Sequence, residues 1–430
     1  MEKLLKVLKR SRKIAAWKVN VVETESTELF YVLKNLETNR ATHTTDYNVT
    51  IYVDKDGQRG SSSFTYYPFM DEEEIKAKID ENVFAASFTM NKLFDIPGKS
   101  KVKIEKSKSN LKKKPFSVLV EEVANAVFKA DKYKQGYLSA TEIFLYKITT
   151  TVINSKGVKV SSVNYKGAIE TIPSWDKGDD EVEVYNMIDF GSLDKKDITK
   201  QIKEALELAK ARSRAKKLNA KKVVPGTKAI VQDNEVAQIF ATFAKDLHYS
   251  SKYSHMNMAE IGQSVQGDNV VGDKLTLKLV PQYAGAIESS AVDQDGVVLK
   301  EVSLIEDGIA KANWGTYRFG FYLGVDEPTG DIPVAVVKEG TKSFEEMKKA
   351  PYIRCVRFSS FQLDPYSGLF GGEVRLGFYF DGKKEVPVTG FSITGNFNDL
   401  KGKFVYSSDT VTLPRYHGPK YIEINDIDVA

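Results

Sequence analysis

The sequence predicts an α+β protein with two domains: an N-terminal domain of mixed strands and helices, residues 1–222, and a β-rich C-terminal domain, residues 223–430. Three observations support this prediction. The chain has 430 residues, and at roughly 100 to 200 residues per domain this length allows two or three domains. Segments with the two-residue period of strands and segments with the 3.6-residue period of helices both occur in the first half. After one further helix, strand and turn signals dominate the second half.

The first elements are predicted from short apolar patterns. Apolar residues between Leu4 and Leu8 share one side of a basic segment, which predicts a short helix. Two stretches rich in β-branched and aromatic residues, Trp17–Glu23 and Glu28–Leu33, predict two strands. Tyr47–Val53 alternates apolar with polar residues and predicts a third strand.

Two helices and three strands are predicted next. Asp71 and Glu74 have the spacing of a capping box, and apolar residues at helical spacing follow them. Phe116–Ala130 also has its apolar residues spaced for one buried helix face. The strands predicted after these helices are Glu142–Ile153, Val158–Tyr165 and Glu181–Asp189.

Asp197–Leu218 has the clearest helical pattern in the chain, with its apolar residues on one face and Lys or Glu elsewhere. Pro225 and Gly226 then interrupt regular structure, so we place the domain boundary between residues 220 and 226. The second domain is predicted to contain a helix at Glu235–Leu247 and a short one near Phe344–Lys349. Turn residues at short intervals predict strands in the remainder.

The composition argues against several classes of function. Lys plus Arg is 62 and Asp plus Glu is 58, and a net charge of only +4 argues against a dedicated nucleic-acid-binding protein. No apolar run approaches the length that crosses a bilayer, and basic residues interrupt the first apolar segment where a signal peptide would continue. We therefore expect a cytoplasmic protein without membrane contact. Four histidines and one cysteine make any metal site sparse or carboxylate-rich, and one cysteine cannot form an intramolecular disulfide.

Common catalytic motifs are absent from the sequence. No histidine is followed by glutamate, so neither HExxH nor HExxxH occurs. The GxSxG elbow, the P-loop and a GxGxxG after a strand are also absent, which removes the commonest hydrolase, NTPase and dinucleotide-binding interpretations.

Three histidines and one cysteine remain as candidates for chemistry. His248 and His255, accompanied by Asp246, could supply metal ligands, but their spacing matches no standard zinc pattern and favours polar loop residues. His417 lies in a turn-rich stretch and has no partner identifiable by spacing. Cys355 could act as a nucleophile only beside a histidine base, and its alternating surroundings favour a structural strand cysteine.

An acidic turn resembles part of a calcium-binding loop. Asp293, Asp295 and Gly296 match its first positions, but the twelfth residue, which should be acidic, is Leu304. The segment therefore predicts a tight turn.

Several separated segments carry a pattern that recurs in one protein family. Residues 291–308 are similar to its "D-x-E-G … L-I-x-x-G" segment, residues 361–373 to its "D-x-x-S/T-G-x-F" strand and residues 386–396 to its "P-V-x-x-x-x-I-x-G-N" strand. In the N-terminal half, Asp56–Ser61 and Leu218–Gly226 also match in consistent order. The chain thereby resembles the TldD/PmbA family of bacterial and archaeal proteins, often labelled modulators of DNA gyrase.

The resemblance implies a comparison with the zinc site of the catalytic members. In those members an HExxxH helix and a cysteine far downstream hold the metal. On the helix Glu235–Leu247, the two histidine positions fall on Ala241 and Asp246 and the glutamate position on Thr242. The cysteine position lies beyond Ile393–Asn396, and residues 396–430 contain no cysteine.

The resemblance is therefore to the PmbA, or TldE-like, branch, which lacks the zinc motif. It implies that this chain has no catalytic or metal-binding residue and no cofactor of its own. It further implies a TldD-like catalytic subunit as partner, with zinc in that partner, and a flexible or unfolded peptide as substrate. Despite the gyrase label, we expect no direct contact with DNA.

Two alternatives stay open at this point. One is a metal-dependent peptidase with a divergent site around Asp246, His248, His255 or His417. The other is a homodimer or larger homo-oligomer that binds peptides as a scaffold without protease activity.

Overall fold

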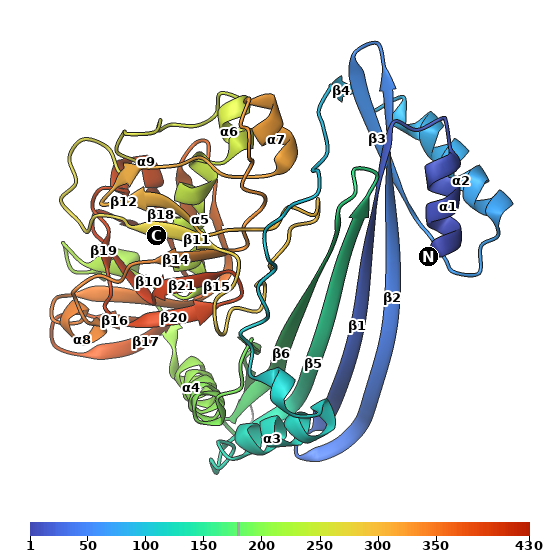
Figure 1. Cartoon of the computed structure of the whole chain (residues 1–430). Helices are drawn as coiled ribbons and strands as arrows, with labels where there is room; N and C mark the ends of the chain where they lie inside the picture. Colours follow the sequence, from blue (N-terminus) through green and yellow to red (C-terminus); the bar gives the residue numbers. More distant parts are fainter. Residues whose placement is uncertain (179–180) are drawn as a thin grey trace.

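The computed structural model describes residues 1–178 and 181–430, and it confirms the predicted α+β class (Figure 1). Its strands form sheets of eight, nine and six strands. The first sheet belongs to the N-terminal half, and the other two are built from the C-terminal half apart from one short strand. The domain boundary after residue 222 stays a prediction.

The first sheet has the strand order β4-β3-β2-β1-β5-β6-β7, and β8 also pairs with β6. The four central strands are long and antiparallel, and they curve along the whole height of the molecule (Figure 1). The strands are β1 (Ala16–Val32), β2 (Asn35–Lys55), β3 (Gln58–Thr65), β4 (Asn91–Lys92), β5 (Gly136–Asn154), β6 (Lys159–Asp176), β7 (Glu181–Glu183) and β8 (Asn186–Phe190).

Two pairs of helices cover opposite ends of this sheet (Figure 1). At one end lie α1 (Glu2–Arg10) and α2 (Glu72–Ala86), and at the other end α3 (Phe116–Phe128) and α4 (Lys195–Arg214), with the short 3₁₀ turn η1 (Leu111–Lys113). The predicted capping box of α2 forms: Asp71 accepts hydrogen bonds from the backbone of Glu73 and Glu74, while Glu74 accepts one from the backbone of Asp71. Each pair of helices buries its apolar side against the sheet.

The first strand differs from its prediction because it is continuous. Residues 24–27, expected to separate two strands, are polar, but each pairs with both β2 and β5. Glu25 forms an ion pair with Lys147 on β5 at 2.6 Å, and the hydroxyls of Ser26 and Thr42 on β2 are 2.7 Å apart. Cross-strand pairs of this kind stabilise a strand whose own residues show no apolar period.

The C-terminal sheets have the orders β19-β22-β10-β15-β16-β17-β9, with β18 and β23 attached, and β13-β12-β11-β14-β21-β20. The nine-stranded sheet contains β9 (Lys216–Lys217), β10 (Lys228–Gln232), β15 (Tyr352–Leu363), β16 (Leu369–Phe380), β17 (Glu385–Thr389), β18 (Phe391–Asn396), β19 (Val405–Tyr406), β22 (Tyr421–Ile424) and β23 (Asp428–Val429). The six-stranded sheet contains β11 (Leu277–Val280), β12 (Val302–Glu306), β13 (Ile309–Ala310), β14 (Val334–Val337), β20 (Thr410–Leu413) and β21 (Tyr416–Pro419).

The predicted helix of the second domain, α5 (Asn234–Asp246), lies in the largest hydrophobic cluster. Phe240 packs edge-on against Tyr406 of β19 and stacks with Tyr416 of β21, so α5 joins the two C-terminal sheets. Phe243 packs against Phe397 with ring centroids 4.8 Å apart. The remaining helices are short: η2 (Ala220–Lys222), α6 (Tyr249–Tyr253), α7 (Tyr317–Tyr322), α8 (Phe344–Met347) and α9 (Phe397–Leu400).

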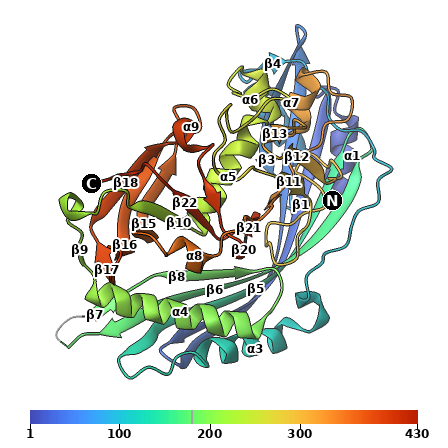
Figure 2. The ribbon, with the colours of Figure 1, turned by 90° about the vertical axis from the view of Figure 1, so that its left-hand side faces the viewer.

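The first sheet contacts the C-terminal half through several polar pairs. Lys18 of β1 forms an ion pair with Asp295 at 2.6 Å, and both side chains are mostly buried. Lys166 of β6 binds Glu288 at 2.8 Å. The helix α4 lies between the first sheet and the strands of the nine-stranded sheet (Figure 2). In the two described segments, no helix has the length and apolar composition needed to span a membrane.

We expect Phe243→Ala to lower the free energy of unfolding by about 3 to 5 kcal/mol, because a phenyl ring that is 1% exposed would leave a cavity in the core. Urea unfolding followed by circular dichroism measures this. The matched control is Phe88→Ala, whose ring is 73% exposed, with an expected change within about 1 kcal/mol. Equal effects of the two substitutions would contradict the packing of α5 described above.

Glu235, in the first turn of α5, makes stability depend on pH. Burial raises the pKa of its carboxyl to about 7, and Asp233 adds to the increase. The unfolded chain has a pKa near 4.3, so the folded protein holds the extra proton between these values. The contribution of Glu235 to the free energy of unfolding is therefore fully present below about pH 4.3. It falls by roughly 3 kcal/mol as the pH rises to about 7.

Glu235→Gln should remove this loss, so the stability of the variant relative to the wild type should rise between pH 4.5 and pH 8. Urea unfolding at a series of pH values tests the expectation. Glu81→Gln, at an exposed position of α2, is the control and should show no such trend. A stability difference between Glu235→Gln and the wild type that stays constant with pH would refute the assignment.

Candidate functional site

The three positions that match the family's zinc helix lie on α5 in very different surroundings. Ala241 is exposed, whereas Thr242 is 7% exposed and its hydroxyl donates to the backbone oxygen of Gln238 at 3.0 Å. Asp246, the last residue of α5, accepts hydrogen bonds from the backbone nitrogens of Met258 and Ala259 at 2.6 and 3.1 Å. Its carboxylate therefore fixes the loop that follows α6.

This set of side chains does not fit a zinc ion. Ala241 carries no donor atom, the Thr242 hydroxyl is neutral and already bonded, and the Asp246 carboxylate is the only metal-binding group among the three. Asp246 also lies close enough to Lys401 to act on it: burial lowers the pKa of Lys401, and Asp246 opposes that decrease. A zinc site in an enzyme needs three protein donors, commonly histidine, cysteine or carboxylate.

The candidate histidines lie apart and have structural contacts. The Nδ1 atom of His248 accepts from the backbone nitrogen of Ser250 at 3.1 Å and caps α6, and its ring packs edge-on against Trp314. His255 is exposed at the end of α6. On β21, His417 stacks on Tyr283 at 4.3 Å and contacts the Thr412 hydroxyl. Burial lowers the pKa of His248 and of His417, so both rings are neutral at pH 7.

Cys355 and the acidic turn have structural surroundings as well. Cys355 is fully buried on β15, and burial, followed by the nearby Glu235, raises the pKa of its thiol far above the usual range. A nucleophilic cysteine needs the opposite change. Asp293 accepts from the backbone nitrogens of Asp295, Val297 and Asp331, which is the arrangement of a tight turn. Burial raises the pKa of Asp293 to about 6.

Among residues 1–178 and 181–430, no three His, Cys, Asp or Glu side chains are grouped so that they could hold a metal ion. The structure does contain an open space that the sequence did not predict. It lies between α4 and the face of the nine-stranded sheet opposite α5, and it consists of two adjoining cavities of about 780 and 940 Å³. We call this space the α4 cleft. Residues shared by both cavities come from both walls: Lys200, Glu204, Leu208, Gln232, Val356, Lys420 and Tyr421.

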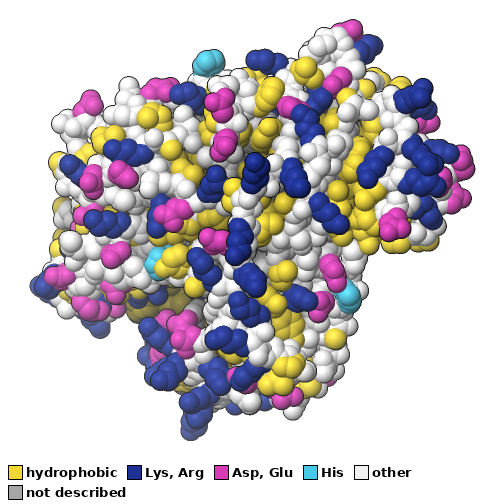
Figure 3. Space-filling model, viewed as in Figure 1, with side chains coloured by type: hydrophobic (Ala, Val, Ile, Leu, Met, Phe, Trp, Pro, Cys, Tyr) yellow, Lys and Arg dark blue, Asp and Glu magenta, His cyan; other side chains and the backbone are white. Residues whose placement is uncertain are grey.

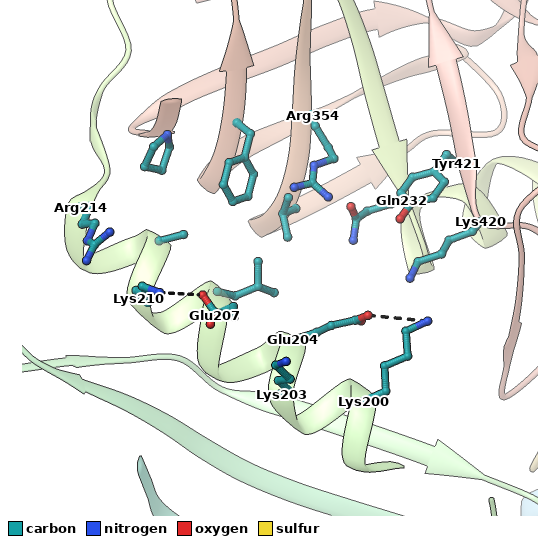
Figure 4. A pocket seen from close by; sticks show the side chains of 15 residues that line it. Lys200, Lys203, Glu204, Glu207, Lys210, Arg214, Gln232, Arg354, Lys420 and Tyr421 are labelled. Carbon is teal, nitrogen blue, oxygen red and sulfur yellow. Dashed lines mark hydrogen bonds and ion pairs between the residues drawn. The ribbon is translucent and has the colours of Figure 1, made fainter. Parts of the chain in front are cut away.

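The local sequence explains the two walls of the α4 cleft. One face of α4 buries its apolar residues against the first sheet, so the opposite face carries charged residues. On the sheet side, Gln232, Arg354 and Phe378 lie on one face because alternate strand residues point the same way. Figure 4 shows the side chains of Arg354, Gln232 and Lys420 reaching from the sheet toward α4.

The first cavity of the α4 cleft is rich in positive charge, whereas more acidic than cationic residues line the second. Six cationic and two acidic residues line its first cavity: Lys200, Lys203, Lys210, Arg214, Arg354, Lys420, Glu204 and Glu207. Lys210 pairs with Glu207 at 3.2 Å, and Lys200 lies 3.9 Å from Glu204. In Figure 3, Lys and Arg side chains gather at the lower left of the molecule, over α4. Burial lowers the pKa of Lys420, but Asp233, Tyr421 and Glu204 together outweigh burial, so the pKa is raised.

Two buried groups in the α4 cleft lack hydrogen-bond partners among the described residues. They are the Nε atom of Arg354 and the Oε1 atom of Gln232. The guanidinium of Arg354 packs over the rings of Phe378 and Phe344, which place it without satisfying its donors. Gln232 is 7% exposed, and its amide nitrogen donates to Asp233 at 2.7 Å. Because buried polar atoms are nearly always bonded, these two mark a place for a ligand or water.

One sequence signal could have pointed to this cleft. Arg354 interrupts the apolar run between Ile353 and Cys355, and Gln232 ends a run of buried residues in β10. A polar residue within a mostly buried strand is informative, because its side chain needs a partner. The other wall, on α4, has the sequence pattern of an ordinary solvent-exposed helix face.

Comparison with known proteins agrees with the sequence resemblance. Residues 225–430 match the family described as PmbA/TldA metallopeptidase C-terminal domain. No curated protein matches this chain. Three solved structures share the fold over the whole chain: a candidate modulator of a DNA gyrase from Thermotoga maritima, TldE from Thermococcus kodakarensis, and a candidate modulator of DNA gyrase from Bacteroides thetaiotaomicron.

The three alignments cover 100% of this chain and 99%, 99% and 97% of the respective structures. Sequence identities are 17%, 17% and 15%, and TM-scores are 0.74, 0.75 and 0.77 in the same order. At such identities the structures establish the fold, and the match over residues 225–430 establishes the relationship. Residues 225–430 belong to the PmbA/TldA metallopeptidase C-terminal domain family, and the whole chain shares the fold of the three structures.

Proposed function

We propose that this chain is the non-catalytic, TldE-like subunit of a cytoplasmic zinc metallopeptidase that cleaves unfolded or flexible peptides. In this proposal a TldD-like subunit holds the zinc, and the present chain contributes shape and peptide contacts. The observation that carries the proposal is the set of side chains on α5: the positions that match the family's HExxxH motif are occupied by Ala241, Thr242 and Asp246.

The chemistry of these side chains supports a non-catalytic role. Zinc hydrolysis needs a metal that lowers the pKa of bound water and a base that accepts its proton. The Thr242 hydroxyl cannot act as that base, because it is neutral at pH 7 and donates to Gln238 inside α5. Asp246 has both carboxylate oxygens bonded to backbone nitrogens, so metal binding there would release the loop at Met258 and Ala259.

The single thiol gives further support. Cys355 lies within the hydrophobic cluster that α5 shares with the nine-stranded sheet, and it is held as a neutral thiol. A thiolate is the form that binds zinc, so this residue would have to be ionised in an apolar core to act as a ligand. Its position on β15 also precedes β18, whereas the catalytic members carry their ligand cysteine after the matching strand.

We expect the purified chain to retain well below one equivalent of zinc after dialysis, because no set of three free donors is present on α5. Metal content is measured by inductively coupled plasma mass spectrometry. The same preparation should not cleave an unfolded substrate such as reduced, alkylated casein.

A full equivalent of zinc with chelator-sensitive cleavage by the isolated chain would overturn the proposal. His248→Ala combined with His255→Ala then identifies the source. Loss of zinc in that variant would favour the divergent metal site, and unchanged zinc would direct attention to Asp246 and His417. Circular dichroism controls for the loss of the cap that His248 supplies to α6.

We further expect the chain to form a complex with a TldD-type subunit that has an intact HExxxH motif. Co-expression with a tag on one subunit, followed by light scattering, measures the mass and composition of the complex. The complex should cleave the casein substrate, and substitution of the first HExxxH histidine in the TldD-type subunit should abolish cleavage. Thr242→Val in the present chain should leave cleavage unchanged.

Failure to co-purify, together with a homodimer of the isolated chain, would favour the scaffold interpretation instead. Loss of cleavage with Thr242→Val in a correctly assembled complex would show that α5 of this chain takes part in catalysis.

A further inference from the structure

We propose that the first cavity of the α4 cleft binds an extended, acidic segment of a peptide. The proposal deepens the proposed function, because it rests on a role in handling peptides and adds the class of peptide and the place where it lies. It is carried by the charge, the unpaired polar atoms and the shape of the space between α4 and the nine-stranded sheet.

The excess positive charge of the first cavity selects an acidic ligand. Lys203, Arg214, Arg354 and Lys420 have no carboxylate within 4.0 Å among the residues that the structure describes. Arg354 and Lys420 are partly buried on the sheet wall, whereas Lys203 and Arg214 are exposed on the helix wall. Cations on both walls of a narrow space raise the local concentration of anions, and partial burial reduces screening by salt.

The unpaired Nε atom of Arg354 and the unpaired Oε1 atom of Gln232 fit a peptide better than a phosphate. The Arg354 Nε–H is a donor that suits a carboxylate or a carbonyl oxygen. The Gln232 Oε1 is an acceptor, and its orientation is set because the amide nitrogen faces the Asp233 carboxylate. A phosphate group at neutral pH offers mainly acceptors and would leave Gln232 unsatisfied. A peptide offers both a backbone N–H and acidic oxygens.

The aromatic residues of the α4 cleft argue against a nucleic-acid strand as the ligand. Tyr421 stacks on Phe344 with ring centroids 4.1 Å apart and an angle of 13°. The ring of Phe378 is covered by the Arg354 guanidinium at 4.5 Å. Proteins that bind single strands use free aromatic faces for base stacking, and these two rings are already engaged.

The size and the apolar floor of the cleft fit a peptide. A volume of about 780 Å³ in the first cavity, with the second adjoining it, exceeds the need of a simple anion. Leu208 and Ala211 of α4, together with Val356 and Pro387 of the sheet, add apolar surface between the charged groups. The geometry thus suits a segment in which acidic and apolar residues alternate.

Binding to the purified full-length chain tests the proposal without any partner subunit. The probe is a fluorescein-labelled peptide of about ten residues with alternating glutamate and leucine, and fluorescence anisotropy measures its affinity. The matched probe carries glutamine in place of glutamate. We expect the acidic peptide to bind, with an affinity that falls as sodium chloride is raised, and the glutamine peptide to bind at least about tenfold more weakly.

Variants locate the binding. Arg354→Gln with Lys420→Gln should weaken binding of the acidic peptide by about tenfold or more. Lys112→Gln with Lys113→Gln removes two charges from η1, outside the cleft, and should change the affinity by less than about threefold. Lys200→Gln with Lys203→Gln tests the helix wall at exposed positions, where the fold is not at risk, and should also weaken binding.

Three results would overturn the proposal. They are equal binding of the acidic and the glutamine peptides, equal loss in the cleft and η1 variants, and displacement of the acidic peptide by a single-stranded oligonucleotide at lower concentration than by unlabelled acidic peptide. Because these measurements use the isolated chain, their failure is distinct from a failure to pair with a TldD-type subunit.

Discussion

The burial of α5 between two sheets is the constraint on which the C-terminal half depends. Phe240 contacts a residue of each sheet, so the helix is the common core element of both layers. A helix packed between two sheets exposes only a narrow stripe of side chains to solvent, and here this stripe contains Gln238, Ala241 and Lys245. Adjacent positions of α5 therefore differ: the side chain at Ala241 is open to solvent, whereas the side chain of Thr242 is enclosed by packing.

The same packing also decides where open space is left. Because α5 fills one face of the nine-stranded sheet, the opposite face is covered only in part, by α8 at one side and by α4 at a distance. The helix α4 is held there by the first sheet, and β9, just after it, pairs with β17 of the nine-stranded sheet. The walls of the α4 cleft thus come from two halves of the chain, each fixed by its own core.

Much of the fold could be predicted from local sequence patterns. The capping box at Asp71 and the apolar spacing of α4 and α5 are local signals, and each of these helices forms, although α4 ends at Arg214 and not at the predicted Leu218. The full length of β1 could not be predicted in this way, because residues 24–27 owe their strand conformation to partners on β2 and β5. Strand pairing between distant segments does not have to produce a periodic pattern in the sequence of either segment.

The candidate site also has one part that could be predicted from the sequence and one part that could not. The placement of Ala241, Thr242 and Asp246 on one helix followed from the family pattern. The α4 cleft could not be foreseen, since Arg214 comes from α4, while Arg354 and Lys420 lie far apart in the C-terminal sequence and only the sheet brings these two together. Their charges also disappear in the overall balance of the chain, which is close to neutral.

The ion pair between Lys18 and Asp295 has a consequence for how the protein is made. The two residues are 277 positions apart, and at about 5 to 20 residues per second the ribosome needs roughly 15 to 55 seconds to add the second after the first. The last strand of the first sheet ends at Phe190, so in the final part of that interval the sheet has to persist without its C-terminal contacts. Its two separate hydrophobic clusters, one at each end of the long strands, supply the means to do so. Synthesis thereby orders assembly, with the N-terminal sheet serving as the template on which the later half docks.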